Sequence, residues 1–406
     1  MSPQHRRTKP FISGYVLQIV IVNLFFYHVS HSLNISPGER WPNGVVKYKL
    51  HDSLTLKDME TMKSAFSDYH TKTCIRFLPW QEKDVDFISL EINVNISYYS
   101  GQTCKTGGYQ YARIGEKNRE LAYFIELLGL ALCLDHEHKR IDRDEFLGLH
   151  ENCETIPTKS ALSIPRGIYD YRSQWHWTCS SCKSGQPKFS NVTICGQTVN
   201  SGLSVLDADG INDLYNCQGC HRHRWRPAES LTHADKANMY SFGIFANDGT
   251  PIYPCRAMVA TGSVIAGRFV ESTKSCRISE DLAQYEATKN VEVLTIPGGL
   301  VKDCSEYKLE NKGDATLINA IQVSGWNSNY KWKSYIAYAT VNMTDGGNDN
   351  SVGNVWKEDG ENGFDRSAEM PVGSVGLRAT EYKVLTCSRD TTCMLNELYD
   401  NRRRCN

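Results

Sequence analysis

Imidazole and carboxylate side chains gather around one strongly apolar segment of this chain. His136 and His138 follow the segment directly, Glu126 lies inside it, and His176 lies further along the chain. Imidazole nitrogens and carboxylate oxygens are ligands that Zn²⁺ takes in proteins, and a carboxylate can also be the general base that activates a metal-bound water. These four residues are therefore the candidates for a metal site, although nothing in their spacing requires one.

The apolar segment is the element that must position these side chains. Residues 120–134 predict a helix that is apolar almost all round, which is typical of a helix buried at the centre of a domain. An unpaired carboxylate buried there is costly, so Glu126 needs a partner or a place at the edge of a cleft. The other elements predicted nearby are strands at 45–50, 74–77 and 86–94 and helices at 54–70 and 204–214.

Residues 36–217 resemble the astacin family of zinc endopeptidases in segments that follow the family's order. The most specific segment runs from His136 to Asp144 and is similar to the stretch after the family's metal-binding helix. The other segments are Trp41–Val46, Thr73–Phe77, Tyr169–Tyr171 and Leu203–Cys217. The resemblance implies an α+β fold, a two-lobed metzincin-type domain with a central helix, and a disulfide between Cys74 and Cys217.

The family's zinc motif, H-E-x-x-H-x-x-G-x-x-H, is degenerate in this chain. Its first two histidines are four residues apart on one helix face, and the third follows a glycine turn. Without a gap, counting back from His136, the first histidine position holds Glu126 and the second holds Leu130. The base position then holds Leu127, and the glycine position holds Cys133.

A second register remains open, with one residue inserted at Gly129. It keeps Glu126 in the general-base position and puts Ile125 at the first ligand position. Both registers leave His136 as the relic of three histidine ligands. The family's methionine turn, S-x-M-H-Y, is altered as well, because tryptophan replaces the methionine at Trp175 and the tyrosine at Trp177.

The N-terminal residues predict export. Basic residues precede an apolar run over 11–27, and small residues at Ser30 and Ser32 suit a cleavage site, so a signal peptide over 1–32 is expected. A retained signal anchor is the alternative, but polar residues interrupt the run. The 15 cysteines favour disulfides in an oxidising compartment. Sequons for glycosylation lie at Asn34, Asn95, Asn191 and Asn342.

Three further expectations follow for the secreted product. No second apolar run is long enough to cross a bilayer, so no stable membrane span is expected after signal cleavage. Too few residues separate Ser32 from Trp41 for the inhibitory prosegment of the family, which predicts no zymogen latency. The resemblance also implies that Glu137 anchors the mature N-terminus.

Length and composition divide the chain into parts. Its 406 residues exceed one compact core, and 45 basic against 46 acidic side chains give no reason to expect nucleic acid as a partner. The predicted parts are a signal peptide (1–32), an astacin-like domain (33–217), a basic linker (218–235) and a mainly β domain (236–406). C-x-x-C pairs at 179–182 and 217–220 would suit structural zinc, but disulfides are favoured in a secreted chain.

Residues 240–387 resemble a diverged pair of DM-nine repeats, which are β-rich modules of lectin-like proteins. The clearest segments are Asp248–Tyr253, Ala266–Arg268 and Val291–Leu294. In that family an aspartate and a lysine are implicated in sugar binding, and their matches here are Asp248 and Arg268. A carboxylate and a cation beside a shallow pocket can accept from and donate to vicinal hydroxyls. The alternative is that both are turn and surface residues.

The expected function is that of a secreted, catalytically inactive astacin homologue that binds an extracellular peptide or glycan. No cofactor is expected, with zinc as the alternative. Two other functions remain open. The first is an active zinc endopeptidase with non-standard ligands, and the second is a structural protein of the extracellular matrix or cell surface.

Overall fold

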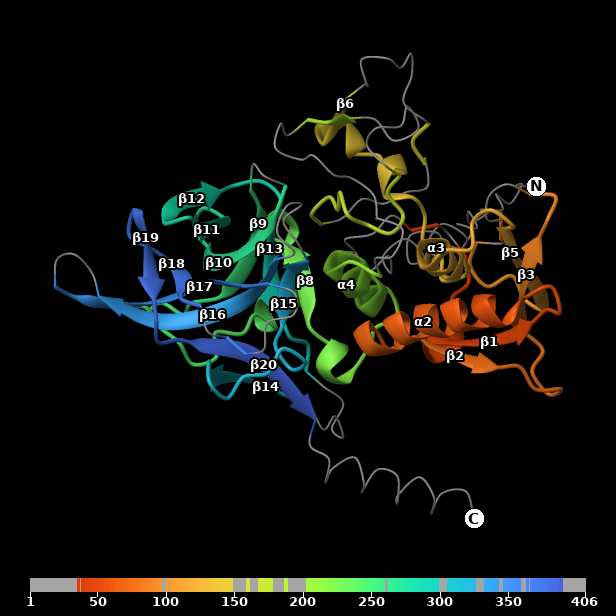
Figure 1. The fold of residues 1–406 in the computed structure, drawn as a ribbon. Coiled ribbons are helices and arrows are strands. Elements are labelled where there is room, and N and C mark those ends of the chain that lie inside the picture. The colour runs from red at the N-terminus through yellow and green to blue at the C-terminus, as the bar shows by residue number, and fades with distance from the viewer. Residues whose placement is uncertain are drawn as a thin grey trace, which may run out of the picture.

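The protein has an α+β first half and a mainly β second half (Figure 1). The computed structural model describes residues 35–389, except 37, 97–99, 102, 149–157, 161–166, 178–185, 189–201, 260–261, 299–304, 326–331, 343–345, 359–362 and 365. The predicted signal peptide, Asn34, Asn191 and the C-x-x-C pair at 179–182 lie outside this part. Within it, no helix has the length and apolarity to cross a membrane.

The first half contains a five-stranded sheet in the order β2-β1-β3-β5-β4, in which only β4 runs antiparallel to its neighbour. The strands are β1 (Val45–Leu50), β2 (Arg76–Pro79), β3 (Phe87–Asn93), β4 (Ser100–Gly101) and β5 (Tyr109–Gly115). The helices are α2 (Leu56–Lys72), α3 (Leu121–Ala131) and α4 (Val205–Leu214), and a short ladder joins β6 (Leu147–Gly148) to β7 (Gln186–Pro187). The strands at 45–50 and 86–94 and the helices at 54–70 and 204–214 are confirmed.

The helix α2 ties the sheet to α3. Thr55 begins the helix with a capping box, in which its side chain and that of Asp58 satisfy each other's backbone N–H groups. The buried face packs on the sheet, with the rings of Phe66 and Phe77 stacked at 4.8 Å between centroids. The hydroxyl of Tyr69 donates a hydrogen bond to the Ile125 carbonyl at 2.8 Å. These contacts fix α3 over the sheet.

The second half is built from two antiparallel sheets. One has the order β12-β11-β10-β9-β13-β8, and the other β14-β20-β16-β17-β18-β19, with β15 paired to β16. The strands of the first are β8 (Arg224–Pro227), β9 (Pro254–Met258), β10 (Val264–Val270), β11 (Ser275–Glu280), β12 (Ala283–Ala287) and β13 (Val291–Thr295). Those of the second are β14 (Ser305–Asn311), β15 (Gln322–Gly325), β16 (Trp332–Asn342), β17 (Asn348–Glu358), β18 (Ala368–Val372), β19 (Val375–Ala379) and β20 (Lys383–Arg389).

The predicted basic linker at 218–235 is wrong, because this segment is folded into the second half. It contains β8, two short 3-10 helices (Gly219–His221 and Ala228–Ser230) and the start of α5 (His233–Ala237). Strand β8 is hydrogen-bonded antiparallel to β13. The sequence shows the charges of the segment, but it does not show that acidic residues of α4 lie opposite them.

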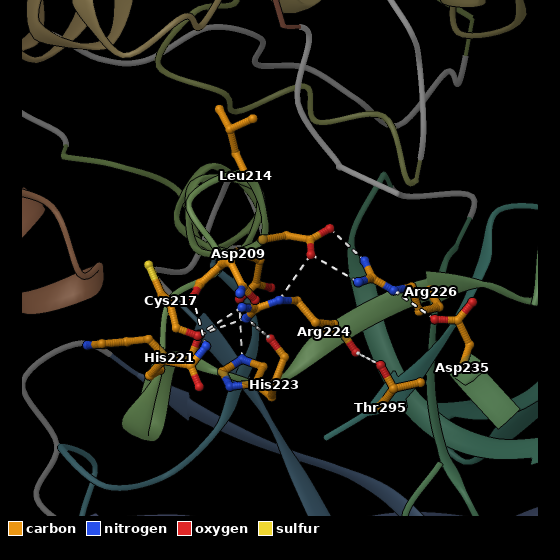
Figure 2. A network of polar contacts seen from close by, with 12 residues as sticks. Asp209, Leu214, Cys217, His221, His223, Arg224, Arg226, Asp235 and Thr295 are labelled. Carbon is orange, nitrogen blue, oxygen red and sulfur yellow. Dashed lines mark hydrogen bonds and ion pairs between the residues drawn. The ribbon is translucent and has the colours of Figure 1, made fainter. Parts of the chain in front are cut away.

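Two of these basic side chains, Arg224 and Arg226, are held by α4, and Figure 2 shows their polar contacts. The carboxylate of Asp213 lies 3.0 Å from Nε of Arg224 and 3.0 Å from Nη2 of Arg226. Arg226 also pairs with Asp235 at 3.1 Å. Arg224 and Asp213 are buried, so charge pairing compensates for the loss of hydration. The basic segment is therefore a joint between the two halves.

A second ion cluster lies beside the first. Arg256 of β9 is fully buried and pairs with Asp209 of α4 and Glu292 of β13, both at 2.7 Å. Its guanidinium also lies over the ring of Trp225, 4.4 Å from the centroid. Since α4 supplies both Asp209 and Asp213, this one helix of the first half carries ion pairs to two elements of the second.

Replacing Asp213 is expected to destabilise the protein strongly. The Asp213→Asn variant leaves the buried guanidinium of Arg224 without this carboxylate and removes one of the two carboxylate partners of the partly buried Arg226. We expect this to lower the free energy of unfolding by about 3–5 kcal/mol. Denaturant unfolding measures the change. The control is Lys236→Ala, whose partner Glu271 lies 2.8 Å away in an exposed pair, and for which about 0.5 kcal/mol or less is expected. Equal effects of the two substitutions would contradict the proposed joint.

Candidate active site

The helix α3 ends earlier than the sequence predicts. The helix stops at Ala131, and Cys133 has φ +74°, the left-handed conformation that glycine usually supplies after a helix. Cys133 therefore has the backbone conformation of the motif's glycine, a position that both registers assign to it. Oε1 of Glu126 also lies 3.1 Å from Nε2 of His136, so the first and third ligand positions meet.

The contact between Glu126 and His136 favours the ungapped register, which places Glu126 where the first histidine would be. Leu127 then stands at the base position and Leu130 at the second histidine position. The general-base role that the gapped register gives to Glu126 stays a prediction, and in the structure its carboxylate contacts His136. Leu127 is buried at 1% exposure and offers no group that could take a proton from water.

Carboxylates contact both ring nitrogens of His136. Besides the Glu126 contact, Nδ1 lies 3.2 Å from Oδ1 of Asp135. A ring that donates from both nitrogens is an imidazolium and has no lone pair for a metal. Burial alone would lower the pKa of His136, but the hydrogen bonds with Asp135 and Glu126 outweigh it and raise the pKa above its ordinary value. The sequence interpretation missed Asp135, although its position next to His136 marks it.

His138 and His176 are directed to other partners. Nδ1 of His138 accepts the Trp177 backbone N–H at 3.4 Å, and burial lowers the pKa of His138 far below its ordinary value. His176 accepts from the Tyr169 hydroxyl at 2.7 Å and donates to the Trp177 carbonyl at 2.6 Å. Burial lowers the pKa of His176 to about 4. Both rings are therefore neutral at physiological pH, and both nitrogens of His176 are engaged.

Zinc does not fit this set of side chains. A catalytic zinc ion takes three protein ligands and keeps one position for water. Here the ligand positions hold Glu126, Leu130 and His136, and the two polar members bind each other. In the part of the chain that the structure describes, no three His, Cys, Asp or Glu side chains are grouped so as to hold a metal ion.

Trp175 fills the space beneath α3 that the family gives to a methionine. It is fully buried, and its indole N–H donates to the Glu126 carbonyl at 3.1 Å. A Cβ added at Gly129 would lie 1.8 Å from Cζ2 of Trp175. Gly129, one helical turn after Glu126, leaves room for the larger side chain. Gly129 and Trp175 are therefore sterically complementary.

Glu137, which the resemblance assigns to the mature N-terminus, pairs with Arg140, and the predicted N-terminus lies outside the described residues. The two side chains are 2.8 Å apart and fully buried, and Glu137 also accepts the Asp170 backbone N–H at 3.1 Å. Burial raises the pKa of Glu137 to about 7, although Arg140 acts in the opposite direction. The buried carboxylate in the loop after α3 is therefore balanced by an arginine of the same loop.

The cysteines discussed in the sequence analysis form disulfides where the structure describes them. Cys74 pairs with Cys217, and Cys104 pairs with Cys133, a pairing that the sequence left open. Cys220 pairs with Cys387, so neither cysteine of the 217–220 pair is a thiolate that could bind zinc.

The two residues predicted to bind sugar are near enough to interact, because hydrogen bonds from Thr250 and, after them, the charge of Arg268 lower the pKa of Asp248. Asp248 lies in an exposed turn and accepts the Thr250 backbone N–H at 2.9 Å. Arg268 lies 3.4 Å from Asp349. Their hydrogen-bonding groups are thus directed at separate partners. Of the sequons, Asn95 and Asn342 are exposed and available to a glycan.

Adding one methyl group at Gly129 is expected to destabilise the protein. Gly129→Ala drives a carbon into Trp175, and overpacking of this kind lowers the free energy of unfolding by about 1–3 kcal/mol. Thermal unfolding measures it. Gly298→Ala is the control, since nothing lies within 4 Å of its added Cβ. A Gly129→Ala variant as stable as the control would contradict the packing of Trp175.

The Glu126–His136 contact predicts a pH-dependent stability. Because the pKa of folded His136 is raised, its stabilisation is complete below about pH 6.5 and is lost as the pH rises through the folded pKa. Glu126→Gln should lower the His136 pKa, measured by NMR titration of the ring. It should also destabilise more at pH 6 than at pH 9. The exposed Glu60→Gln is the control, and an unchanged His136 pKa in Glu126→Gln would contradict the contact.

Comparison with known proteins relates the first half to one protein family. Residues 34–216 match the model of the Astacin peptidase family. The zinc metalloproteinase nas-14 of Caenorhabditis elegans is 32% identical over 209 residues, 47% of this chain and 40% of that protein. The embryonic protein UVS.2 of Xenopus laevis is 28% identical over 197 residues, 44% of this chain and 37% of that protein.

A solved structure is similar over the same part. High choriolytic enzyme 1, a hatching enzyme zinc-protease from Oryzias latipes (Medaka fish), is 26% identical and has a TM-score of 0.38, over 44% of this chain and 94% of that one. The chain spans less than half the length of the two curated relatives named above. The β region beyond residue 216 stays unassigned. Residues 34–216 are an astacin-type metalloprotease domain, and the protein is a homologue of the astacin-family zinc metalloproteases.

Proposed function

We propose that this protein is a secreted astacin homologue without peptidase activity and that it acts as an extracellular binding protein. One observation carries the proposal: the Glu126–His136 pair stands where the family holds its zinc. The metal would have to displace the proton on Nε2, and it would then find an apolar side chain, Leu130, at the remaining position. Both changes disfavour metal binding.

The groups expected to perform hydrolysis are replaced as well. Leu127 at the base position cannot activate water. Trp177 stands where the family's tyrosine faces substrate, and its ring lies against His138 at 4.6 Å between centroids. The scaffold around these positions is intact, with Tyr69 and Trp175 both bonded to carbonyls of α3. A preserved fold with an altered centre supports a role in binding.

The disulfides and the astacin homology are consistent with secretion. The ligand we propose is an extracellular peptide or glycan. The β-rich second half, which resembles DM-nine repeats of lectin-like proteins, favours a glycan. Its firm attachment to the first half through Asp209 and Asp213 suits a protein whose halves work as one body.

Zinc content separates this proposal from an active protease. The secreted full chain, analysed by inductively coupled plasma mass spectrometry, should hold well below one zinc per chain and leave peptide substrates uncleaved. The triple variant Glu126→His, Leu127→Glu, Leu130→His restores the motif and should bind about one zinc. Adding His136→Ala to the triple variant is the control, and it should lose the metal again.

Two results would contradict the proposal. The first is about one zinc per wild-type chain together with chelator-sensitive cleavage of a peptide. The second is about one zinc per chain in both the wild type and the triple variant. The wild-type residues would then bind the metal as well as the restored motif does.

A further inference from the structure

A cavity of about 540 Å³ lies in the second half, where the turn between β11 and β12 faces β16 to β19. Two tryptophans line it, Trp332 and Trp356, together with Glu369 and Arg366. The volume is in the range of ligand-binding pockets. None of these residues belongs to the site around His136 or to the predicted sugar pair, Asp248 and Arg268.

Glu369 is the buried polar group of the cavity. The residue is 8% exposed, and its Oε2 has no hydrogen-bond partner among the residues described by the structure. Burial raises the pKa of the Glu369 carboxyl, while backbone N–H groups of Leu282 and Asp281 oppose the rise. A buried carboxylate oxygen without a donor is costly in free energy, and a ligand hydroxyl would supply the missing hydrogen bond.

The turn at the rim is strained. Asp281 has φ +51° and Leu282 has φ +65°, a pair of left-handed residues that hairpins usually build from asparagine and glycine. Leucine in this conformation is held by its surroundings: its carbonyl accepts the Gly376 N–H at 3.2 Å. Gln284 donates to the Gly373 carbonyl at 2.9 Å beside it. Such strain is retained mainly at functional sites.

The aromatic wall is fixed by a cation. The guanidinium of Arg366 lies over the Trp332 ring, 3.9 Å from its centroid, which orders both side chains. Trp332 and Trp356 are only partly buried, so indole surface is available to a ligand. Flat aromatic surface beside polar groups is suited to a ligand with one apolar face and a polar edge.

The mixed charge of the lining narrows the ligand class. Glu280, Asp281 and Glu369 disfavour an anion, and Arg366 and Arg378 disfavour a cation. A neutral molecule with many hydroxyl groups suits both sets of side chains, because hydroxyls donate to carboxylates and accept from guanidinium groups. We infer that this cavity binds a neutral saccharide, with Glu369 accepting from its hydroxyls and the tryptophans contacting its C–H face. The inference rests on the proposed function as a binding protein, and it assigns the ligand class and the place.

Calorimetric titration of the secreted full chain tests the inference. The probes are glucose, galactose, mannose, N-acetylglucosamine and disaccharides of each, with N-acetylneuraminic acid as the anionic and glucosamine as the cationic comparison. At least one neutral probe should bind, in preference to the charged ones. Trp332→Ala and Glu369→Gln should each weaken it about tenfold or more, through the lost aromatic contact and the lost charged acceptor.

Glu60→Ala is the matched control, because it removes an exposed carboxylate from α2 in the first half, and its affinity should equal that of the wild type. Asp248→Ala tests the other residue predicted to bind sugar. Near-UV circular dichroism verifies the fold of each variant. If Trp332→Ala unfolds, Glu369→Gln still tests the cavity, because it keeps the volume of the side chain. The inference is overturned if no neutral saccharide binds, if only charged probes bind, or if Asp248→Ala alone abolishes binding. Zinc content and cleavage are measured separately, so failure here leaves the test of the missing protease activity intact.

Discussion

A carboxylate in the middle of an apolar, buried helix must be paired, and this requirement governs the centre of the first half. Glu126 is 5% exposed in a helix whose other buried residues are apolar. Without a partner it would destabilise the fold by several kcal/mol, on the order of the whole stability of a small domain. His136 supplies the partner, and Asp135 supplies the second carboxylate that keeps the ring charged. In a zinc site a metal ion lies at this point, whereas here the side chains of Glu126 and His136 contact each other.

The helix α4 links this centre to the rest of the molecule. Near its N-terminus, Asp207 accepts the Ser173 hydroxyl at 2.7 Å and the Gln174 N–H at 2.8 Å, which holds the loop that carries Trp175. Further along, Asp209 and Asp213 pair with arginines of the second half. The helix α4 thus holds the loop that packs beneath α3 and also binds the second half. A structural change at either place would act on the backbone of α4.

Much of the first half could be predicted because its signals are local. The period of apolar residues predicts α2, and the helix predicted at 204–214 is found as α4. The choice between the two motif registers could not be predicted, since it depends on a contact between Glu126 and His136. The match between Gly129 and Trp175 could not be predicted either, because the two residues are far apart in the sequence and neither is unusual alone.

In the second half, charge was the misleading signal. A run of arginines and histidines suggests a solvated segment because the acidic partners of Arg224 and Arg226 lie in other elements, and only folding reveals that they are opposite. The cavity near Glu369 escaped prediction for a related reason. Its lining comes from two sheets, and neither strand pattern contains a motif.

The disulfides give the covalent chain an unusual shape. Cys74–Cys217 closes a loop over a separation of 143 residues, and Cys220–Cys387 closes another over 167. Only Gln218 and Gly219 lie between them, so the backbone forms a figure of eight whose two rings meet at a dipeptide. Each ring restricts the unfolded state of its own half, by about 5 kcal/mol in the chain-entropy view. A protease that cuts a surface loop within one ring would leave its fragments covalently joined, while a single cut at the crossing point would break the one covalent link between the rings that the described residues contain.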